Sequence, residues 1–275
     1  MTETPIPVPG GDFSDSEIEA DGFSIRYREA GSGDALVCLH GGGGLKLTGV
    51  HDILAASRRV VAFEIPGFGA SPENTRSASL EELAGTMNAA VSALGIEAFA
   101  VMGNSFGAKL ALMMAVVRPE PIQSIVLVAP AAIRLDVPPA AIDPRADPRA
   151  DPSTLLYAYP ERQPTAEPTP PEIQAKQRAL VGRLIGPPRD RPFEDSLSAI
   201  EVDVLALFGT LDRVTPPEVA HLYREIIPTC NLVMVYDAAH AIDADRPEAV
   251  ASVVDDFLTH HEGFLVRRKS GIIHP

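Results

Sequence analysis

The sequence contains little cysteine. Only Cys38 and Cys230 occur among the 275 residues, each within an apolar run, and neither belongs to a cluster with metal-ligand spacing. Two isolated thiols are typical of a protein kept in a reducing compartment. We therefore expect two buried free thiols, a cytoplasmic location, and no metal ion or other cofactor.

Positive charge is also scarce. Lysine and arginine number 23 against 37 acidic residues, which gives a formal net charge of −14. A surface of that sign repels the phosphates of nucleic acids and of anionic membranes. The longest apolar run, Leu110 to Val117, is far shorter than a membrane span. The composition therefore argues against nucleic-acid and membrane partners, and the acidic, proline-rich N-terminus is unlike a signal peptide.

Short apolar runs alternate with longer stretches of helical periodicity. Most of these runs have the composition of parallel strands that are covered on both faces. Strands are expected at 23–28, 35–39, 60–64, 98–102, 124–128, 203–208 and 232–236, and helices at 80–94, 105–117, 170–186, 216–227 and 247–259. This alternation predicts an α/β fold with a mostly parallel central sheet flanked by helices.

Residues 131–198 interrupt the alternation and hold half of the chain's 26 prolines. Because proline cannot donate to a strand ladder, this segment cannot lie inside the sheet. Its apolar side chains are expected to dock over the sheet as a lid, although a partly disordered surface loop, mainly at 138–153, is an alternative. The predicted organisation is an N-terminal extension (1–21), a core (22–130 and 199–260), a cap (131–198) and a C-terminal tail (261–275).

The stretch Gly-Asn-Ser-Phe-Gly at 103–107 joins an expected strand directly to an expected helix. A serine in so tight a turn adopts a strained backbone, and the residues two before and two after it must lack side chains. Gly103 and Gly107 meet this requirement, and the helix start favours negative charge on a bound substrate. Ser105 is therefore the predicted nucleophile. The alternative is an ordinary strand-to-helix turn with glycines for close packing.

A serine hydroxyl needs a base to take its proton, and the base needs an acid that orients it. His240 follows the strand at 232–236 and precedes the last helix, so it should lie at the same edge of the sheet as Ser105. Asp212 follows the strand at 203–208 and is the predicted acid. The reaction should therefore slow in acid, as the histidine becomes protonated.

Three further polar residues near the expected acid and base have other interpretations. Thr215, with Glu218 three residues later, is expected to cap the helix that follows it. Asp245 is expected to be the N-cap of the last helix. Asp243 is an alternative candidate for the acid because it lies three residues after His240.

A glycine run, His40 to Gly44, follows the strand at 35–39 and offers unobstructed backbone N–H groups. Such groups can stabilise the oxyanion of acyl transfer. The run lacks the glycine spacing of dinucleotide sites and the Gly-Lys-Ser/Thr ending of phosphate loops, so a nucleotide site is disfavoured. His40 is expected to brace the loop. The predicted oxyanion and substrate-binding residues are Gly42, Phe106, Gly41 and Asn104.

The order Ser105, Asp212, His240, each after a strand, resembles the α/β-hydrolase superfamily. The resemblance covers about residues 22–260 and includes EIPGFGAS at 64–71, where Glu64 replaces the family's usual aspartate. It implies the α/β-hydrolase fold, with a proline-rich helical cap inserted after the sixth strand. It also implies a serine hydrolase without a cofactor.

GNSFG together with HGGGG is similar to the carbon–carbon bond hydrolases that cleave ring-fission products of aromatic degradation. Those enzymes usually carry Pro-Gly and a nearby asparagine after the glycine run, where this chain has GLKLTGV. The main expectation is therefore a small carboxylesterase or lactonase acting on a small molecule with an apolar part. Alternatives are a carbon–carbon hydrolase, an acyltransferase, and a non-catalytic ligand-binding module. The tail could pack on a second subunit, so a homodimer is left open.

Overall fold

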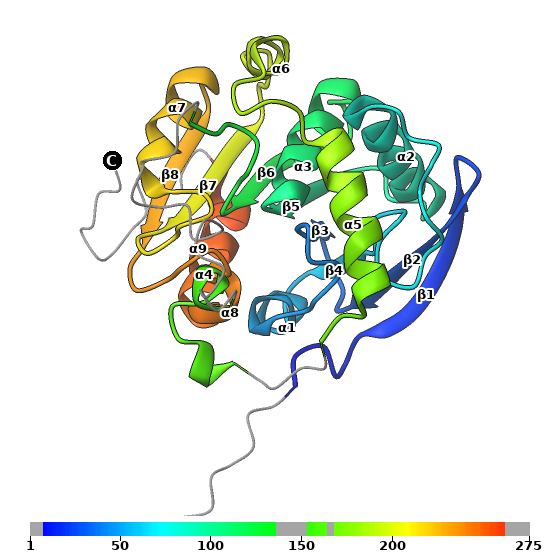
Figure 1. The fold of residues 1–275 in the computed structure, drawn as a ribbon, viewed down its shortest axis with the longest axis horizontal. Coiled ribbons are helices and arrows are strands. Elements are labelled where there is room, and N and C mark those ends of the chain that lie inside the picture. The colour runs from blue at the N-terminus through cyan, green and yellow to red at the C-terminus, as the bar shows by residue number, and fades with distance from the viewer. Residues whose placement is uncertain (1–7, 136–152, 164–167, 262–275) are drawn as a thin grey trace, which may run out of the picture.

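In the computed structural model of the protein, residues 8–135, 153–163 and 168–261 are described (Figure 1). One eight-stranded sheet runs through them in the order β1-β2-β4-β3-β5-β6-β7-β8. The strands are β1 (Ser14–Ala20), β2 (Phe23–Ala30), β3 (Ala35–Leu39), β4 (Arg59–Phe63), β5 (Phe99–Asn104), β6 (Ile122–Val128), β7 (Asp203–Gly209) and β8 (Cys230–Val235). The β1–β2 and β2–β4 pairs are antiparallel and the others are parallel, which confirms the predicted sheet.

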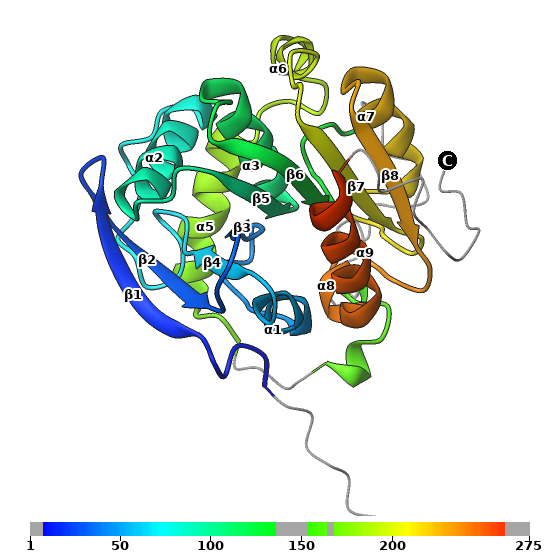
Figure 2. The same ribbon diagram turned by 180° about the vertical axis from the view of Figure 1, so that it is seen from behind.

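Helices cover both faces of this sheet (Figures 1 and 2). One buried cluster forms beneath α2 (Leu80–Ala93), α3 (Phe106–Val117) and α7 (Ala220–Ile226). A second forms beneath α1 (Gly49–Ala55) and α9 (Pro247–His260) on the opposite face. The remaining helical segments are α4 (Ser153–Leu156), η2 (Pro160–Arg162), α5 (Pro171–Leu184), α6 (Arg191–Leu197), η3 (Pro217–Val219) and α8 (Ile242–Asp245).

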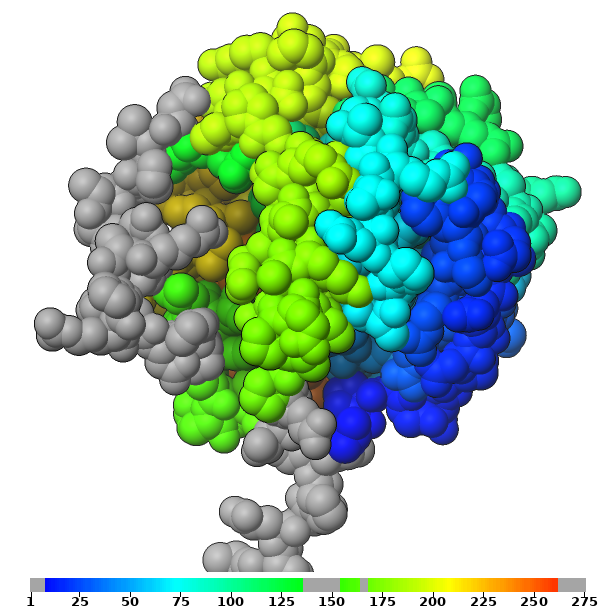
Figure 3. All heavy atoms as spheres, turned by 45° about the vertical axis from the view of Figure 1, so that its right-hand side comes forward, coloured from blue at the N-terminus to red at the C-terminus, as the bar shows by residue number. Residues whose placement is uncertain are grey.

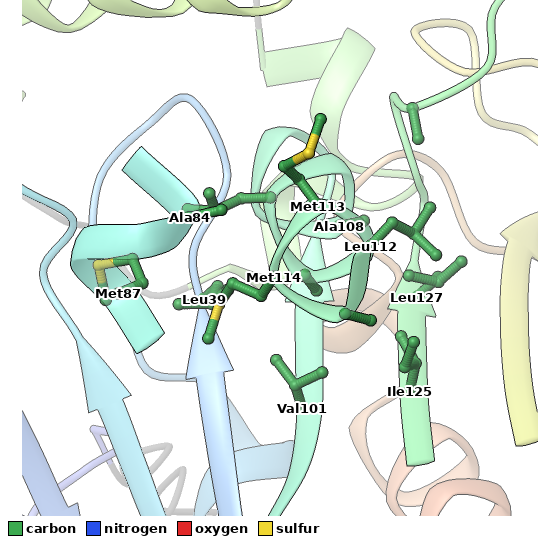
Figure 4. Packing of buried hydrophobic residues seen from close by; sticks show 14 of the residues in the cluster. Leu39, Ala84, Met87, Val101, Ala108, Leu112, Met113, Met114, Ile125 and Leu127 are labelled. Atoms are coloured by element: carbon green, nitrogen blue, oxygen red, sulfur yellow. The ribbon is translucent and has the colours of Figure 1, made fainter. Parts of the chain in front are cut away.

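Apart from Lys109, helix α3 is apolar on all sides, as expected of a helix that is buried from Phe106 to Ala115. Figure 4 shows its Met114 above Val101 of β5, on the side of Met87 of α2, and its Leu112 on the other side, near Leu127 and Ile125 of β6. Interiors of this kind are close-packed and have low compressibility. The turn at the start of α3 therefore rests on a fixed support.

Strand β1 was not predicted. Residues 14–20, which were expected to belong to an N-terminal extension, are part of the sheet. The strand pairs with β2 from Ser14 to Ala20, and most of its side chains are exposed. Its acidic residues are poor strand formers in general, and the segment has no apolar run from which a strand could be predicted. Such charges suit an edge strand, because they oppose pairing with another chain.

The described part of residues 131–198 docks on the core as a cap. Leu180 and Leu184 of α5 are buried, and Arg183 Nη2 donates to the carbonyl oxygen of Asn74 at 2.6 Å. Helix α5 lies in front of β3 in Figure 1. Residues 136–152 and 262–275 lie outside the described residues, and with them nearly all of the loop proposed at 138–153 and of the C-terminal tail.

Lys109 of α3 ties the far end of the cap to the core, although it is only 1% exposed. Its Nζ donates to the carbonyl oxygen of Ile185 at 2.8 Å and lies 3.4 Å from Asp190 Oδ2. It also lies 4.6 Å from the ring centroid of Phe193. Burial lowers the pKa of Lys109 below its ordinary value, and the Asp190 carboxylate opposes that shift. A buried cation with three partners thus joins α3 to the cap.

Replacing Leu112 by alanine tests how much the packing of α3 contributes to stability. Leu112 is fully buried, so the substitution should leave a cavity and lower the free energy of unfolding by about 2–5 kcal/mol. Urea unfolding measures the change. Val117→Ala on the same helix is the control, because Val117 is 43% exposed and its loss should change stability by roughly 0.5 kcal/mol or less. Equal effects of the two substitutions would contradict this account of the core.

Candidate active site

Ser105 lies in a strained turn between β5 and α3, with φ 50° and ψ −109°. A Cβ on Gly103 would lie 2.3 Å from the carbonyl oxygen of Gly107. A Cβ on Gly107 would lie 2.3 Å from the carbonyl oxygen of Leu39. Both neighbours are backbone atoms that cannot move aside, so these two positions require glycine. The structure thus agrees with the expectation that the residues two before and two after Ser105 must lack side chains.

The three residues predicted as nucleophile, base and acid lie together. His240 Nε2 is 3.0 Å from Ser105 Oγ, and His240 Nδ1 is 2.9 Å from Asp212 Oδ2. A buried carboxylate accepts, so Nδ1–H is the donor on that side and Nε2 is left to accept from the serine hydroxyl. Asp212 is 3% exposed and His240 is 7% exposed. The arrangement places a base within hydrogen-bond distance of the partly exposed Ser105, while the acid and the base are themselves buried.

Close backbone contact brings the loops that carry Asp212 and His240 together. A Cβ on Gly209, the last residue of β7, would lie 2.4 Å from the carbonyl oxygen of Ala238. The N–H of Leu211 donates to that same carbonyl at 2.9 Å. The distance between the proposed acid and base thus depends on the parallel pairing of β7 and β8 and on Gly209, which lets the two loops come into contact.

Thr215 donates hydrogen bonds to Asp212. The prediction that Thr215 caps the following helix is wrong. Its hydroxyl donates to Asp212 Oδ2 at 2.7 Å, and its N–H donates to Asp212 Oδ1 at 2.9 Å. The N-cap of η3 is Pro216, without a side-chain bond. Short polar side chains often bond to nearby groups within a turn in place of a helix end. The threonine hydroxyl also lies 3.4 Å from His240 Nδ1, so it contacts both residues.

His40 braces the glycine loop as predicted. Its Nδ1–H donates to the carbonyl oxygen of Gly41 at 2.7 Å, and its Nε2 accepts from the N–H of Ile65 at 3.0 Å. Burial lowers the pKa of His40 to about 4. The ring is therefore neutral at pH 7, as its acceptor role toward Ile65 requires, and it is not a second base.

The N–H groups of Gly42 and Phe106, the predicted oxyanion donors, have no acceptor among the described residues. Phe106 is the first residue of α3, where an N–H has no partner within the helix. A Cβ on Gly41 would lie 2.7 Å from Asn104 Oδ1 and 3.3 Å from Ser105 Cβ. Gly41 therefore lets the glycine loop approach the nucleophile turn, and Asn104 lies against that loop.

Helix α5 of the cap covers the glycine loop. Gln177 is 3% exposed; its Oε1 accepts from the N–H of Gly69 at 3.1 Å and its Nε2 lies 3.5 Å from the carbonyl oxygen of Gly42. A Cβ on Gly42 would lie 3.7 Å from Val181 Cγ2. Figure 3 shows a hollow in the surface beside α5. Sequence reasoning did not single out Gln177, since nothing in a helical pattern shows which glutamine faces a loop far away in the chain.

The two aspartates after His240 have roles other than those predicted. Asp243 Oδ2 accepts from the Thr48 hydroxyl at 3.1 Å, and Asp212 is the carboxylate that contacts the His240 ring. Asp245 is not the N-cap of α9, which is Arg246. Its Oδ2 accepts from the N–H of Ala239 at 2.8 Å. The prediction failed because the short helix α8 precedes α9 and turns Asp245 back toward the base.

Within the described residues there is no group of three histidine, cysteine or acidic residues that could hold a metal ion. No helix of the described chain is long and apolar enough to cross a membrane. Cys38 and Cys230 are buried and unpaired with each other, and burial raises the pKa of both thiols.

The sequence model of the alpha/beta hydrolase family matches residues 36–253. This chain belongs to that family. The fold and the enzyme class inferred from the resemblance are thereby confirmed.

Relatives of the chain include hydrolases of carbon–carbon bonds. The 2-hydroxymuconate semialdehyde hydrolase of Pseudomonas putida is 24% identical over 88% of this chain and 93% of its own. Among solved structures, the 2-hydroxy-6-oxo-6-phenylhexa-2,4-dienoate hydrolase of Rhodococcus sp. strain RHA1 has a TM-score of 0.72 at 20% identity, covering 90% of this chain and 99% of that one. A bacterial membrane phospholipase A has a TM-score of 0.73 at 21% identity, covering 90% and 86%. At such identities the structural likenesses show the fold alone.

Replacing Thr215 by valine tests its support of Asp212. Valine keeps the shape but removes the hydroxyl donor, so the carboxylate should turn away from His240. We expect kcat/KM for a short ester to fall about tenfold, as for the loss of a hydrogen bond worth about 1.4 kcal/mol. Thr215→Ser keeps the donor and should retain most of the activity. A valine variant as active as the serine variant would show that this hydroxyl does not support Asp212.

The buried His40 predicts that stability depends on pH. Its pKa of about 4 in the folded state lies below the ordinary value of about 6.5, so the unfolded state binds the proton more readily. The free energy of unfolding should therefore fall as the pH drops from about 6.5 to 4, by about 2 kcal/mol between pH 7 and pH 5. Urea unfolding at both pH values measures it. His40→Gln should lose this part of the pH dependence, and an unchanged slope would rule out this source.

Proposed function

We propose that the protein is a serine hydrolase in which Ser105 is the nucleophile, His240 the general base and Asp212 the acid that orients the base. The observation that carries the proposal is the unbroken chain of contacts at 3.0 Å and 2.9 Å through the two ring nitrogens of His240. The strained turn at Ser105 supports it, since such strain is concentrated at functional sites.

In the proposed reaction, Ser105 Oγ bonds to the carbonyl carbon of the substrate while His240 Nε2 takes the hydroxyl proton. The resulting oxyanion accepts from the N–H groups of Gly42 and Phe106. When this tetrahedral intermediate breaks down, the leaving group takes the proton from His240 and an acyl-enzyme remains. Water, deprotonated by the same histidine, then releases the acid and restores Ser105.

Two substrate classes fit this reaction. Relatives named as 2-hydroxymuconate semialdehyde hydrolases, which align over most of the chain, favour cleavage of a carbon–carbon bond next to a carbonyl group, with a stabilised carbanion as leaving group. The stretch GLKLTGV after the glycine loop departs from that group and favours a small ester or lactone. Both are small molecules with an apolar part, and we propose no nucleic-acid or membrane partner.

Labelling with a fluorophosphonate tests the proposed nucleophile. The wild-type protein should be labelled and should cleave p-nitrophenyl acetate. Ser105→Ala should abolish labelling, and Asp212→Asn should lower kcat/KM by roughly ten-thousandfold. The control is Asp243→Asn, which changes the nearby carboxylate that bonds to Thr48 and should leave labelling intact. A wild-type protein that is neither labelled nor active on esters or dienoates would refute the proposal.

Comparison of substrates separates the two classes. A 2-hydroxy-6-oxo-dienoate should be cleaved with a far higher kcat/KM than short esters and lactones if the relatives indicate the class correctly. The reverse order would assign the chain to the carboxylesterases or lactonases.

A further inference from the structure

The backbone N–H groups of both residues that flank His240 make hydrogen bonds. The N–H of Ala239, the residue before it, donates to Asp245 Oδ2 at 2.8 Å. The N–H of Ala241, the residue after it, donates to the carbonyl oxygen of Leu156 in the cap at 2.7 Å. The backbone that carries the base is thus fixed on one side by a carboxylate and on the other by the cap.

The same oxygen of Asp245 also binds the cap directly. Its Oδ2 accepts from the N–H of Ala158 at 2.9 Å, and Oδ1 lies 3.4 Å from Gln163 Nε2. The guanidinium of the next residue, Arg246, lies 5.3 Å from the ring centroid of Tyr159. These contacts agree with Figure 1, where α4 lies beside α8. One carboxylate oxygen therefore joins the N–H of a cap residue, Ala158, to the N–H of Ala239, the residue before His240.

Loss of this carboxylate would leave a donor without a partner in a buried place. Ala239 is 2% exposed, so its N–H could reach water only if the loop moved. His240 is the next residue, and its ring would move with that loop. A displacement on the order of 1 Å is enough to slow a positioned reaction about a hundredfold.

We propose that Asp245 is a positioning residue for the general base, and that through it the place of His240 depends on the docked cap. The proposal rests on the serine-hydrolase function proposed above. In this arrangement the cap segment at 153–163 is more than a cover, because the base is aligned for proton transfer only when the segment is bound to Asp245.

Two substitutions at 245 and one at 243 test the first part. Asp245→Ala should lower kcat for p-nitrophenyl acetate about tenfold or more, with KM changed about threefold or less, because alignment of the base and not substrate binding is affected. Asp245→Asn keeps an oxygen acceptor for the two N–H groups and should restore most of kcat. Asp243→Ala, two residues away, removes a carboxylate that bonds to Thr48 and should leave kcat unchanged.

A spectroscopic signal separates positioning from a general loss of structure. The proton on His240 Nδ1, hydrogen-bonded to Asp212, should give a far-downfield proton resonance in the wild-type protein. Asp245→Ala should shift or broaden it, whereas Asp245→Asn should leave it in place. Circular dichroism should show the same helix content in all variants.

The dependence on the cap is tested from the cap side. Ala158→Pro removes the N–H that donates to Asp245 and leaves the residues around His240 untouched. It should lower kcat and shift the same resonance, and in combination with Asp245→Ala it should add little, because both break one connection. A fully active Ala158→Pro variant would show that Asp245 acts on its own loop alone.

These outcomes are distinct from failure of the proposed function. If the wild type is inactive and unlabelled, the hydrolase proposal fails, whatever the resonance of His240 does. If the wild type is active and Asp245→Ala matches it in kcat and in the resonance, only the positioning proposal is overturned.

Discussion

The structure depends on backbone approaching backbone at the carboxyl edge of the sheet. At Gly103, Gly107 and Gly209 a single added carbon would lie within 2.4 Å of a carbonyl oxygen. These contacts hold Ser105 in its strained turn and bring the loops of Asp212 and His240 within reach of it. The distances between the proposed catalytic residues thus follow from the close packing of the main chain.

Sequence reasoning succeeded where the cause is local. The order of strand, turn and helix around Ser105, and the strand that precedes each of Asp212 and His240, can be read from neighbouring residues. The sheet and its cap were predictable for the same reason, since apolar runs and proline density mark them directly. β1 escaped because an exposed edge needs no apolar run.

The failures share a different cause. Thr215 and Asp245 were both read as helix caps, because short polar residues before a helix usually are. In the structure Thr215 donates to the proposed acid, Asp212, and Asp245 accepts from the N–H of Ala239, the residue before the proposed base. Gln177 gave no signal at all, because its partners at Gly42 and Gly69 lie more than a hundred residues away. A local pattern cannot distinguish a polar group that caps its own helix from one that serves a distant loop.

The buried lysine of α3 bears on how such an enzyme can change its substrate. Exchange of the segment after β6 is a natural route to new specificity, because that segment is inserted into an otherwise intact core. Lys109, however, is almost inaccessible to water and relies on the cap for a carbonyl oxygen, a carboxylate and an aromatic face. A foreign cap without these groups would leave an unpaired charge in the interior, four residues from the proposed nucleophile. Cap and position 109 must therefore change together, and this couples the evolution of specificity to that of the core.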